Sequence, residues 1–137
     1  MSAAPLKAQL AGSFGRAIVT TRTHHLVVDS PPLFNGPNEA INPVELLLGS
    51  LATCGIFVCE AVAKEKGYGL TGGSAQVSGA MKADPPNMGL QTVTVKLDLV
   101  GVTEAEAADL VDAFRSRCPV YATLSKAAPI EFEVSVS

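Results

Sequence analysis

The sequence has no tryptophan, only two tyrosines and few positive charges. Ten Lys and Arg residues against 13 Asp and Glu residues give the 137-residue chain a net charge of -3. The basic residues are scattered, so no basic stripe is available to follow a phosphate backbone. We therefore expect no nucleic-acid partner.

Cysteine is also scarce, and its pattern excludes structural uses. The three cysteines are an odd number and form no Cys-x-x-Cys pair, which argues against a disulfide framework or a structural zinc site. His24 and His25 are adjacent in a predicted strand, so their side chains point to opposite faces and cannot share a metal. The first residues lack the apolar core and cleavage pattern of a secretory signal. We predict a cytoplasmic protein, in which a disulfide is usually catalytic or transient.

One long stretch, from Leu46 to Cys59, has no charged residue. A transmembrane helix needs about 20 apolar residues, and this run is shorter and is flanked by Glu45 and Glu60. It predicts a buried helix of a protein that has no membrane partner.

The first third of the chain has short β-type runs with polar residues between them, which predict an antiparallel meander ending near Ser30. The segment 30–43 is dense in Pro, Asn and Gly and predicts a loop. Asn42 is the expected N-cap of the central helix, with Pro43 at its first position and Gly67 just past its end.

Two further strands are expected after this helix, joined by the turn-rich segment 84–89, and the second alternates apolar and polar residues. Thr103 and Glu106 form a capping box for a helix to about Ser116, and a short helical piece from Pro119 to about Lys126 follows. An alternating strand ends the chain. The order of elements predicts one α+β domain over residues 1–137, with antiparallel sheets and a long buried central helix.

Gly49 and Gly55 lie inside the predicted central helix, where each costs about 1 kcal/mol relative to alanine. Close approach of another helix would offset this cost. A small domain has few helices to cover an apolar one on every side, so a second copy of the chain is a plausible neighbour. A loosely packed helix is the alternative.

The residues alone leave the roles of the cysteines open. Cys59 lies about 140° round the helix from Cys54, so packing in the core is its simplest role. Cys118 precedes Pro119 at an expected helix N-terminus, which lowers a thiol pKa and makes it the more reactive thiol on these grounds alone.

Cys54 lies about three turns into its helix, beyond the reach of the positive end of that helix. It can be a thiolate at neutral pH only if a cation is brought to it. The candidate cations are Arg16, Arg22, Arg115 and Arg117.

Two segments together resemble a known family. NPVELLLGSLATC, from Asn42 to Cys54, and CPVYATLSKA, from Cys118 to Ala127, are similar to motifs of the OsmC/Ohr family of thiol-dependent hydroperoxide reductases. The order of predicted elements agrees over nearly the whole chain. The resemblance implies an intertwined homodimer with the long helices at its centre and an antioxidant role in the stress response.

The resemblance also implies a peroxidase mechanism that reverses the ranking of the thiols. Cys54 attacks an organic hydroperoxide, and Cys118 resolves the resulting sulfenic acid as a redox-active disulfide. A lipoyl-type or small dithiol is the expected reductant, and no metal or other cofactor is needed. An arginine of the N-terminal strands supplies the cation, with Arg22 the nearest match by position and Arg16 the second.

One position departs from the family pattern. The acid that usually holds the arginine directly follows the helix proline, where this chain has Val44, and Glu45 is the nearest substitute. This departure supports a second hypothesis, in which the chain is a non-enzymatic dimeric binding module or a redox sensor with the same fold.

Overall fold

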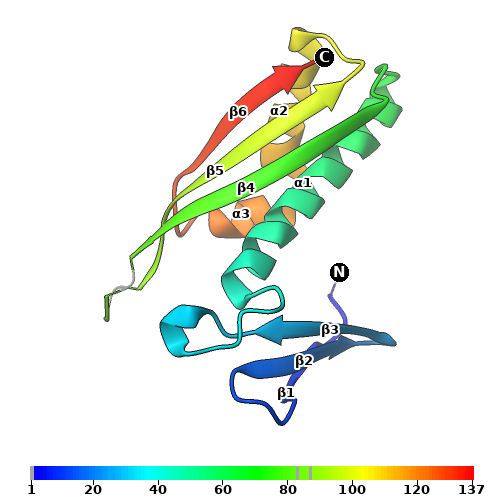
Figure 1. Cartoon of the computed structure of the whole chain (residues 1–137). Helices are drawn as coiled ribbons and strands as arrows, with labels where there is room; N and C mark the ends of the chain where they lie inside the picture. The colour runs from blue at the N-terminus through cyan, green and yellow to red at the C-terminus, as the bar shows by residue number, and fades with distance from the viewer. Residues whose placement is uncertain (1, 83, 87) are drawn as a thin grey trace. The chain divides into compact units, whose positions relative to one another are not determined.

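The computed structural model describes residues 2–82, 84–86 and 88–137. The chain divides into two compact units, with the boundary between Leu47 and Leu48, and we describe each unit by itself. The elements follow the order β1, β2, β3, η1, α1, β4, β5, α2, α3, β6 (Figure 1). The single domain predicted from the length stays a prediction.

The N-terminal unit is a three-stranded antiparallel meander, as predicted. Its strands are β1 (Lys7–Leu10), β2 (Arg16–Thr21) and β3 (His24–Asp29), in the spatial order β1-β2-β3. The following loop contains one short 3-10 helix, η1 (Pro32–Phe34). Within residues 2–47 the buried positions are Val28 and Asp29, so this unit has almost no apolar core of its own.

Helix α1 (Pro43–Lys66) begins and ends where the sequence predicts. The Asn42 side chain accepts hydrogen bonds from the backbone N–H groups of Val44 and Glu45, and Glu45 accepts one from the Asn42 N–H. This reciprocal arrangement is a capping box. Gly67, with φ of 70°, ends the helix in the left-handed conformation that glycine adopts readily.

The C-terminal unit contains the second sheet, in the order β4-β5-β6. Strands β4 (Gly72–Lys82) and β5 (Gly89–Val100) are antiparallel, and the connecting segment predicted at 84–89 includes Asn87, which lies outside the described residues. The alternation in β5 is confirmed, because its four inward side chains are at most 1% exposed: Val93, Val95, Leu97 and Leu99.

The prediction of antiparallel sheets is wrong for the last strand. Strand β6 (Ile130–Val136) pairs with β5 in the parallel direction. The chain leaves β5 and returns to the same end of the sheet through α2 (Glu104–Arg117) and α3 (Pro119–Leu124). A helical crossover of this length delivers the next strand parallel to the first.

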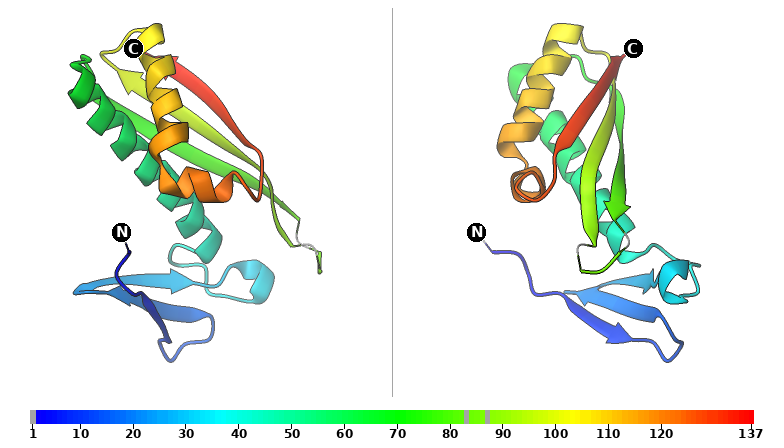
Figure 2. Two further views of the ribbon diagram at one scale, coloured as in Figure 1. Left: turned by 180° about the vertical axis from the view of Figure 1, so that it is seen from behind. Right: turned by 90° about the vertical axis from the view of Figure 1, so that its left-hand side faces the viewer.

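Helices of the C-terminal unit cover one face of this sheet (Figure 2). The predicted capping box of α2, Thr103 with Glu106, is present. Phe114 of α2 is fully buried, and a Cβ atom at Gly55 would overlap its ring. The close approach expected at Gly55 is therefore made by α2 of the same chain. A Cβ atom at Gly49 would meet none of the described residues within 4 Å.

Helix α1 is less buried than predicted. Its buried residues within the chain are Leu51, Gly55, Cys59, Val62 and Ala63, which lie toward the sheet and α2. By length and composition α1 could cross a membrane, and 28% of its most apolar window is buried. Phe57, at 65% exposure, marks the uncovered side.

Candidate active site

Two of the three cysteines meet in the C-terminal unit. Cys54 lies in the middle of α1, and Cys118 lies at the junction where α2 ends and α3 begins. The Cys118 thiol donates to the Cys54 sulfur across 2.9 Å. A disulfide bond needs the two sulfurs to approach to about 2.05 Å, so oxidation requires a movement of about 1 Å.

The environment of Cys118 opposes ionisation. Its sulfur accepts a hydrogen bond from the Tyr121 N–H at 3.3 Å, which is the helix-terminus contact expected from the sequence. The residue is only 1% exposed, however, and burial, followed by the hydrogen bond to Cys54, raises its pKa from 9.0 to about 11. The prediction of a lowered pKa at Cys118 is therefore wrong, because loss of hydration outweighs the short helix.

Cys54 is the more accessible member of the pair, since it is half-buried whereas Cys118 is buried. Cys118 is protonated at neutral pH and gives its proton toward Cys54, so the Cys54 sulfur is the acceptor of this contact. Its greater accessibility makes Cys54 the candidate nucleophile of the pair.

Cys59 packs in the core, as its position round the helix predicted. It is 0% exposed, and its thiol donates to the Leu110 carbonyl at 3.7 Å. Burial raises its pKa to about 11, which keeps it protonated at neutral pH. Cys59 is therefore a small apolar side chain of the α1–α2 interface.

Two of the four candidate arginines are engaged away from the sulfurs. Arg117 donates to Glu65 at 2.7 Å. Arg115 lies over the Phe132 ring, with its Cζ atom 4.8 Å from the ring centroid, and forms an ion pair with Asp112 at 3.6 Å. The remaining candidates, Arg16 and Arg22, belong to the N-terminal unit.

Arg16 is held by two carboxylates. Its Nε and Nη2 atoms donate to the two oxygens of Asp29 at 2.7 and 2.8 Å, and Nη2 also donates to Glu39 at 2.8 Å. Asp29 is 1% exposed and also accepts from the backbone N–H groups of Glu39 and Ala40. The hydrogen bonds from Arg16, with these backbone donors, lower the pKa of Asp29 from 3.8 to about 2.

A cavity of about 360 Å³ lies beside the Arg16–Asp29 pair, within the N-terminal unit. Apolar side chains dominate its lining: Leu10, Ala17, Val28, Pro31, Phe34, Pro43 and Val44. A fixed guanidinium beside an apolar wall suits a ligand with one polar end and a hydrocarbon body.

The other sequence-predicted residues have local roles. Arg22 occupies the two-residue turn between β2 and β3, is exposed, and has a positive φ of 52°. Glu45 completes the capping box at the start of α1. The pairing of an N-terminal arginine with Cys54, and the part of Glu45 in it, stay predictions. Among the described residues, no three His, Cys, Asp or Glu side chains are grouped to hold a metal.

Asp29 and Glu39 were not identified from the sequence as partners of Arg16. Asp29 stands directly opposite Arg16 in the register of the β2–β3 hairpin, whereas the Glu39 contact depends on the path of the loop after β3. One signal was present: Asp29 ends the apolar run LVVD, where a buried carboxylate demands a cation or several donors.

Comparison with known structures defines the class of fold. An OsmC-like protein from Mycoplasma pneumoniae is 19% identical, with a TM-score of 0.87 over 98% of this chain and 97% of that one. A Legionella pneumophila structure described as an organic hydroperoxide resistance protein OsmC is 23% identical, with a TM-score of 0.82 over 99% and 98%. Bacillus subtilis OhrB is 20% identical, with a TM-score of 0.73 over 98% of each chain.

The fold is therefore that of the OsmC and Ohr proteins, as the resemblance predicted. The family described as OsmC-like protein matches residues 36–133, which include both cysteines of the pair. The chain belongs to this family. No curated protein matches the chain significantly.

The Arg16–Asp29 pair predicts a pH-dependent stability. Because the pKa of Asp29 is lower in the folded state, its contribution is complete above pH 3.8 and is lost as the pH falls toward about 2. We expect Asp29→Asn to lower the Tm at pH 7, and the difference from wild type to shrink between about pH 4 and pH 2. Thermal unfolding of both proteins, followed by circular dichroism at several pH values in this range, measures the difference in Tm. A difference that stays constant with pH would contradict the ion pair.

Proposed function

We propose that this protein is a thiol-dependent peroxidase that reduces organic hydroperoxides to alcohols. The observation that supports it most is the 2.9 Å contact between Cys54, half-buried, and Cys118, buried, in a chain of the OsmC-like family. Solved proteins of the same fold carry the description organic hydroperoxide resistance protein, which agrees with such a substrate.

In the proposed reaction, the Cys54 thiolate attacks the distal oxygen of the hydroperoxide. The O–O bond breaks, the sulfur gains a hydroxyl as sulfenic acid, and the alkoxide takes a proton and leaves as the alcohol. The Cys118 sulfur then displaces that hydroxyl as water, with the Cys118 proton, and the disulfide forms. A lipoyl-type or small dithiol reduces it by exchange and becomes a disulfide itself.

Cys118 suits the resolving role for the same reason that it is a poor nucleophile. Its pKa of about 11 keeps it as an unreactive thiol toward peroxide, while its position lets it capture the sulfenic acid before a second peroxide does. Cys54 needs the opposite environment and so needs a cation.

Arg16 is the stronger candidate for that cation. Asp29 and Glu39 hold its guanidinium in place. These two carboxylates would take over the role of the acid that the family usually has at the position of Val44. The Nε and Nη2 atoms of Arg16 make these bonds, and among the bonds between described residues none uses Nη1, which leaves that nitrogen for a sulfur or a peroxide. Arg22 is the alternative predicted from position, with Glu45 as its supporting acid.

A homodimer is part of the proposal. The N-terminal unit exposes many large apolar side chains: Leu6, Leu10, Phe14, Ile18, Leu26, Val27, Leu33 and Phe34. On α1, Phe57 is exposed, and a Cβ atom at Gly49 would have no atom of the described residues within 4 Å. Exposed apolar surface of this extent marks an interface.

The peroxidase proposal predicts a defined change in mass. One equivalent of cumene hydroperoxide should remove two hydrogens from the reduced protein and link Cys54 to Cys118, as peptide mass spectrometry will reveal. With a dithiol present, wild type should consume peroxide catalytically, whereas Cys54→Ser should not. Cys118→Ser should become overoxidised at Cys54.

The same measurement separates the alternative functions. A redox sensor would form the disulfide once but would not turn over with any dithiol. A binding module whose cysteines only pack would stay reduced.

The choice of arginine predicts unequal effects of matched variants. Lysine keeps the charge but not the planar fork, so replacing the functional arginine by lysine should lower kcat/KM on the order of 100-fold. We expect this loss for Arg16→Lys and a change of less than about threefold for Arg22→Lys. Glu45→Gln, which keeps the cap, serves as the third variant, and Tm values of all three identify losses caused by unfolding. The reverse order of Arg16 and Arg22 would assign the role to Arg22.

The dimer predicts a mass twice that of the 14.1 kDa chain. Sedimentation velocity of the reduced protein should give this mass at micromolar concentration. Phe57→Asp should shift the protein toward the monomer, because a carboxylate buried in an apolar interface is unpaired. A wild-type protein that sediments as a monomer would contradict this part of the proposal.

A further inference from the structure

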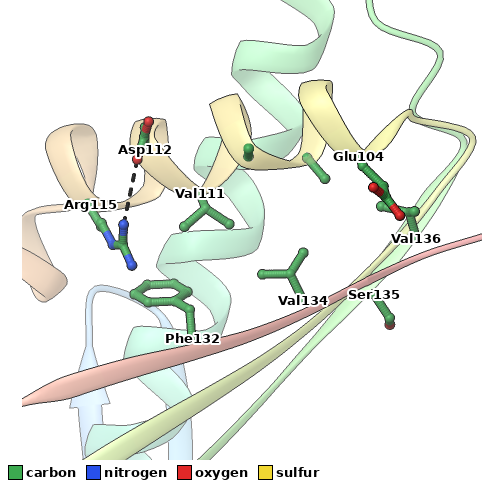
Figure 3. Close-up of a pocket in the computed structure, with 10 residues that line it drawn as sticks. Glu104, Val111, Asp112, Arg115, Phe132, Val134, Ser135 and Val136 are labelled. Carbon is green, nitrogen blue, oxygen red and sulfur yellow. Dashed lines mark ion pairs between the residues drawn. The ribbon is translucent and has the colours of Figure 1, made fainter.

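A groove of about 540 Å³ lies between α2 and β6 in the C-terminal unit, and no cysteine lines it (Figure 3). Its volume is within the range of small-molecule sites. Ten residues line it: Glu104, Ala107, Ala108, Val111, Asp112, Arg115, Phe132, Val134, Ser135 and Val136.

The middle of the groove is apolar. Val111 of α2 and Val134 of β6 face each other across it, and Val136 continues the apolar floor along the strand. Val134 is 43% exposed, which is high for an inward position of the sheet. The Ser135 hydroxyl donates to Asp98 on the strand beside it and is engaged there. The groove therefore offers hydrocarbon contact along its length.

The two ends of the groove carry opposite charges. Arg115 lies over Phe132 at one end, and Glu104 lies beside Val136 at the other (Figure 3). The ion pair of Arg115 with Asp112 is long, at 3.6 Å, and the Asp112 side chain is 76% exposed at the rim. The Arg115 Cζ atom lies 4.8 Å from the centroid of the Phe132 ring, and this contact holds the guanidinium at the end of the groove, where its donors can meet a carboxylate.

The strand that forms the floor is also a sheet edge. In the described sheet β6 pairs with β5 on one side only. The backbone of an edge strand can accept another extended chain, and a groove between an edge strand and a helix provides pockets for its side chains.

We propose that this groove binds a short, extended, apolar peptide with free ends. The peptide carboxylate pairs with Arg115, its ammonium group pairs with Glu104, and its backbone runs antiparallel to β6. Positions 104 and 115 are about 16 Å apart along a helix, which fits about three extended residues plus a hydrogen bond at each end. The proposal is independent of the proposed redox function, because it uses none of the thiols.

Isothermal titration of the reduced protein with trivaline tests the proposal. We expect a Kd below about 1 mM, and amidation of the peptide carboxylate should weaken it about fivefold to tenfold. Arg115→Gln should weaken trivaline by the same factor and should leave the amidated peptide unaffected. At the other end, N-acetylation of the peptide should weaken binding by a similar factor. Glu104→Gln should weaken trivaline equally and should leave the acetylated peptide unaffected.

A matched pair of variants checks the location. Ala105 and Ala108 are both exposed on α2, but only Ala108 lines the groove. Ala108→Trp should fill the groove and abolish binding, whereas Ala105→Trp should bind as wild type. Absence of binding to wild type at several millimolar trivaline, or equal affinity for trivaline and the doubly blocked peptide, would overturn the proposal.

Discussion

The contact between the Phe114 ring and the bare backbone of Gly55 positions the thiol pair. Gly55 follows Cys54 directly on α1, and Phe114 lies one turn before Cys118 on α2, with the Cys118 N–H bonded to the Phe114 carbonyl. The distance between the two helices at this point therefore sets the distance between the two sulfurs. A side chain at position 55 would hold the helices apart and separate the pair.

Burial has opposite outcomes at two acidic groups of this chain, the Cys118 thiol and the Asp29 carboxyl. Burial keeps Cys118 protonated despite its place at a helix start, and the contact with Cys54 adds to this effect. In the N-terminal unit, hydrogen bonds to Asp29 outweigh the effect of burial on its pKa. Asp29 is just as buried as Cys118, yet a bidentate guanidinium and two backbone donors keep it ionised. The number of donors around a buried acid, rather than its depth, decides its charge.

Features encoded by neighbouring residues could be predicted from the sequence. The capping residues Asn42 and Thr103, the helix end at Gly67 and the alternation in β5 all appear in the structure. The parallel direction of β6 was not predicted, although the two expected helices before it are a crossover of the kind that joins parallel strands. The raised pKa of Cys118 was missed because burial by distant segments outweighs the local helix contact.

The parallel pairing of β6 with β5 has a consequence for assembly of the C-terminal unit. Two helices separate the paired strands, so this sheet is completed only by a contact between segments far apart in the sequence. Non-local pairings of this kind slow folding, because the entropy of closing the intervening loop is lost before the contact is gained. Cys118 belongs to the segment that makes the crossover. The thiol pair is thus itself a non-local contact, between two cysteines 64 residues apart, and it depends on the same crossover that carries the chain from β5 to β6.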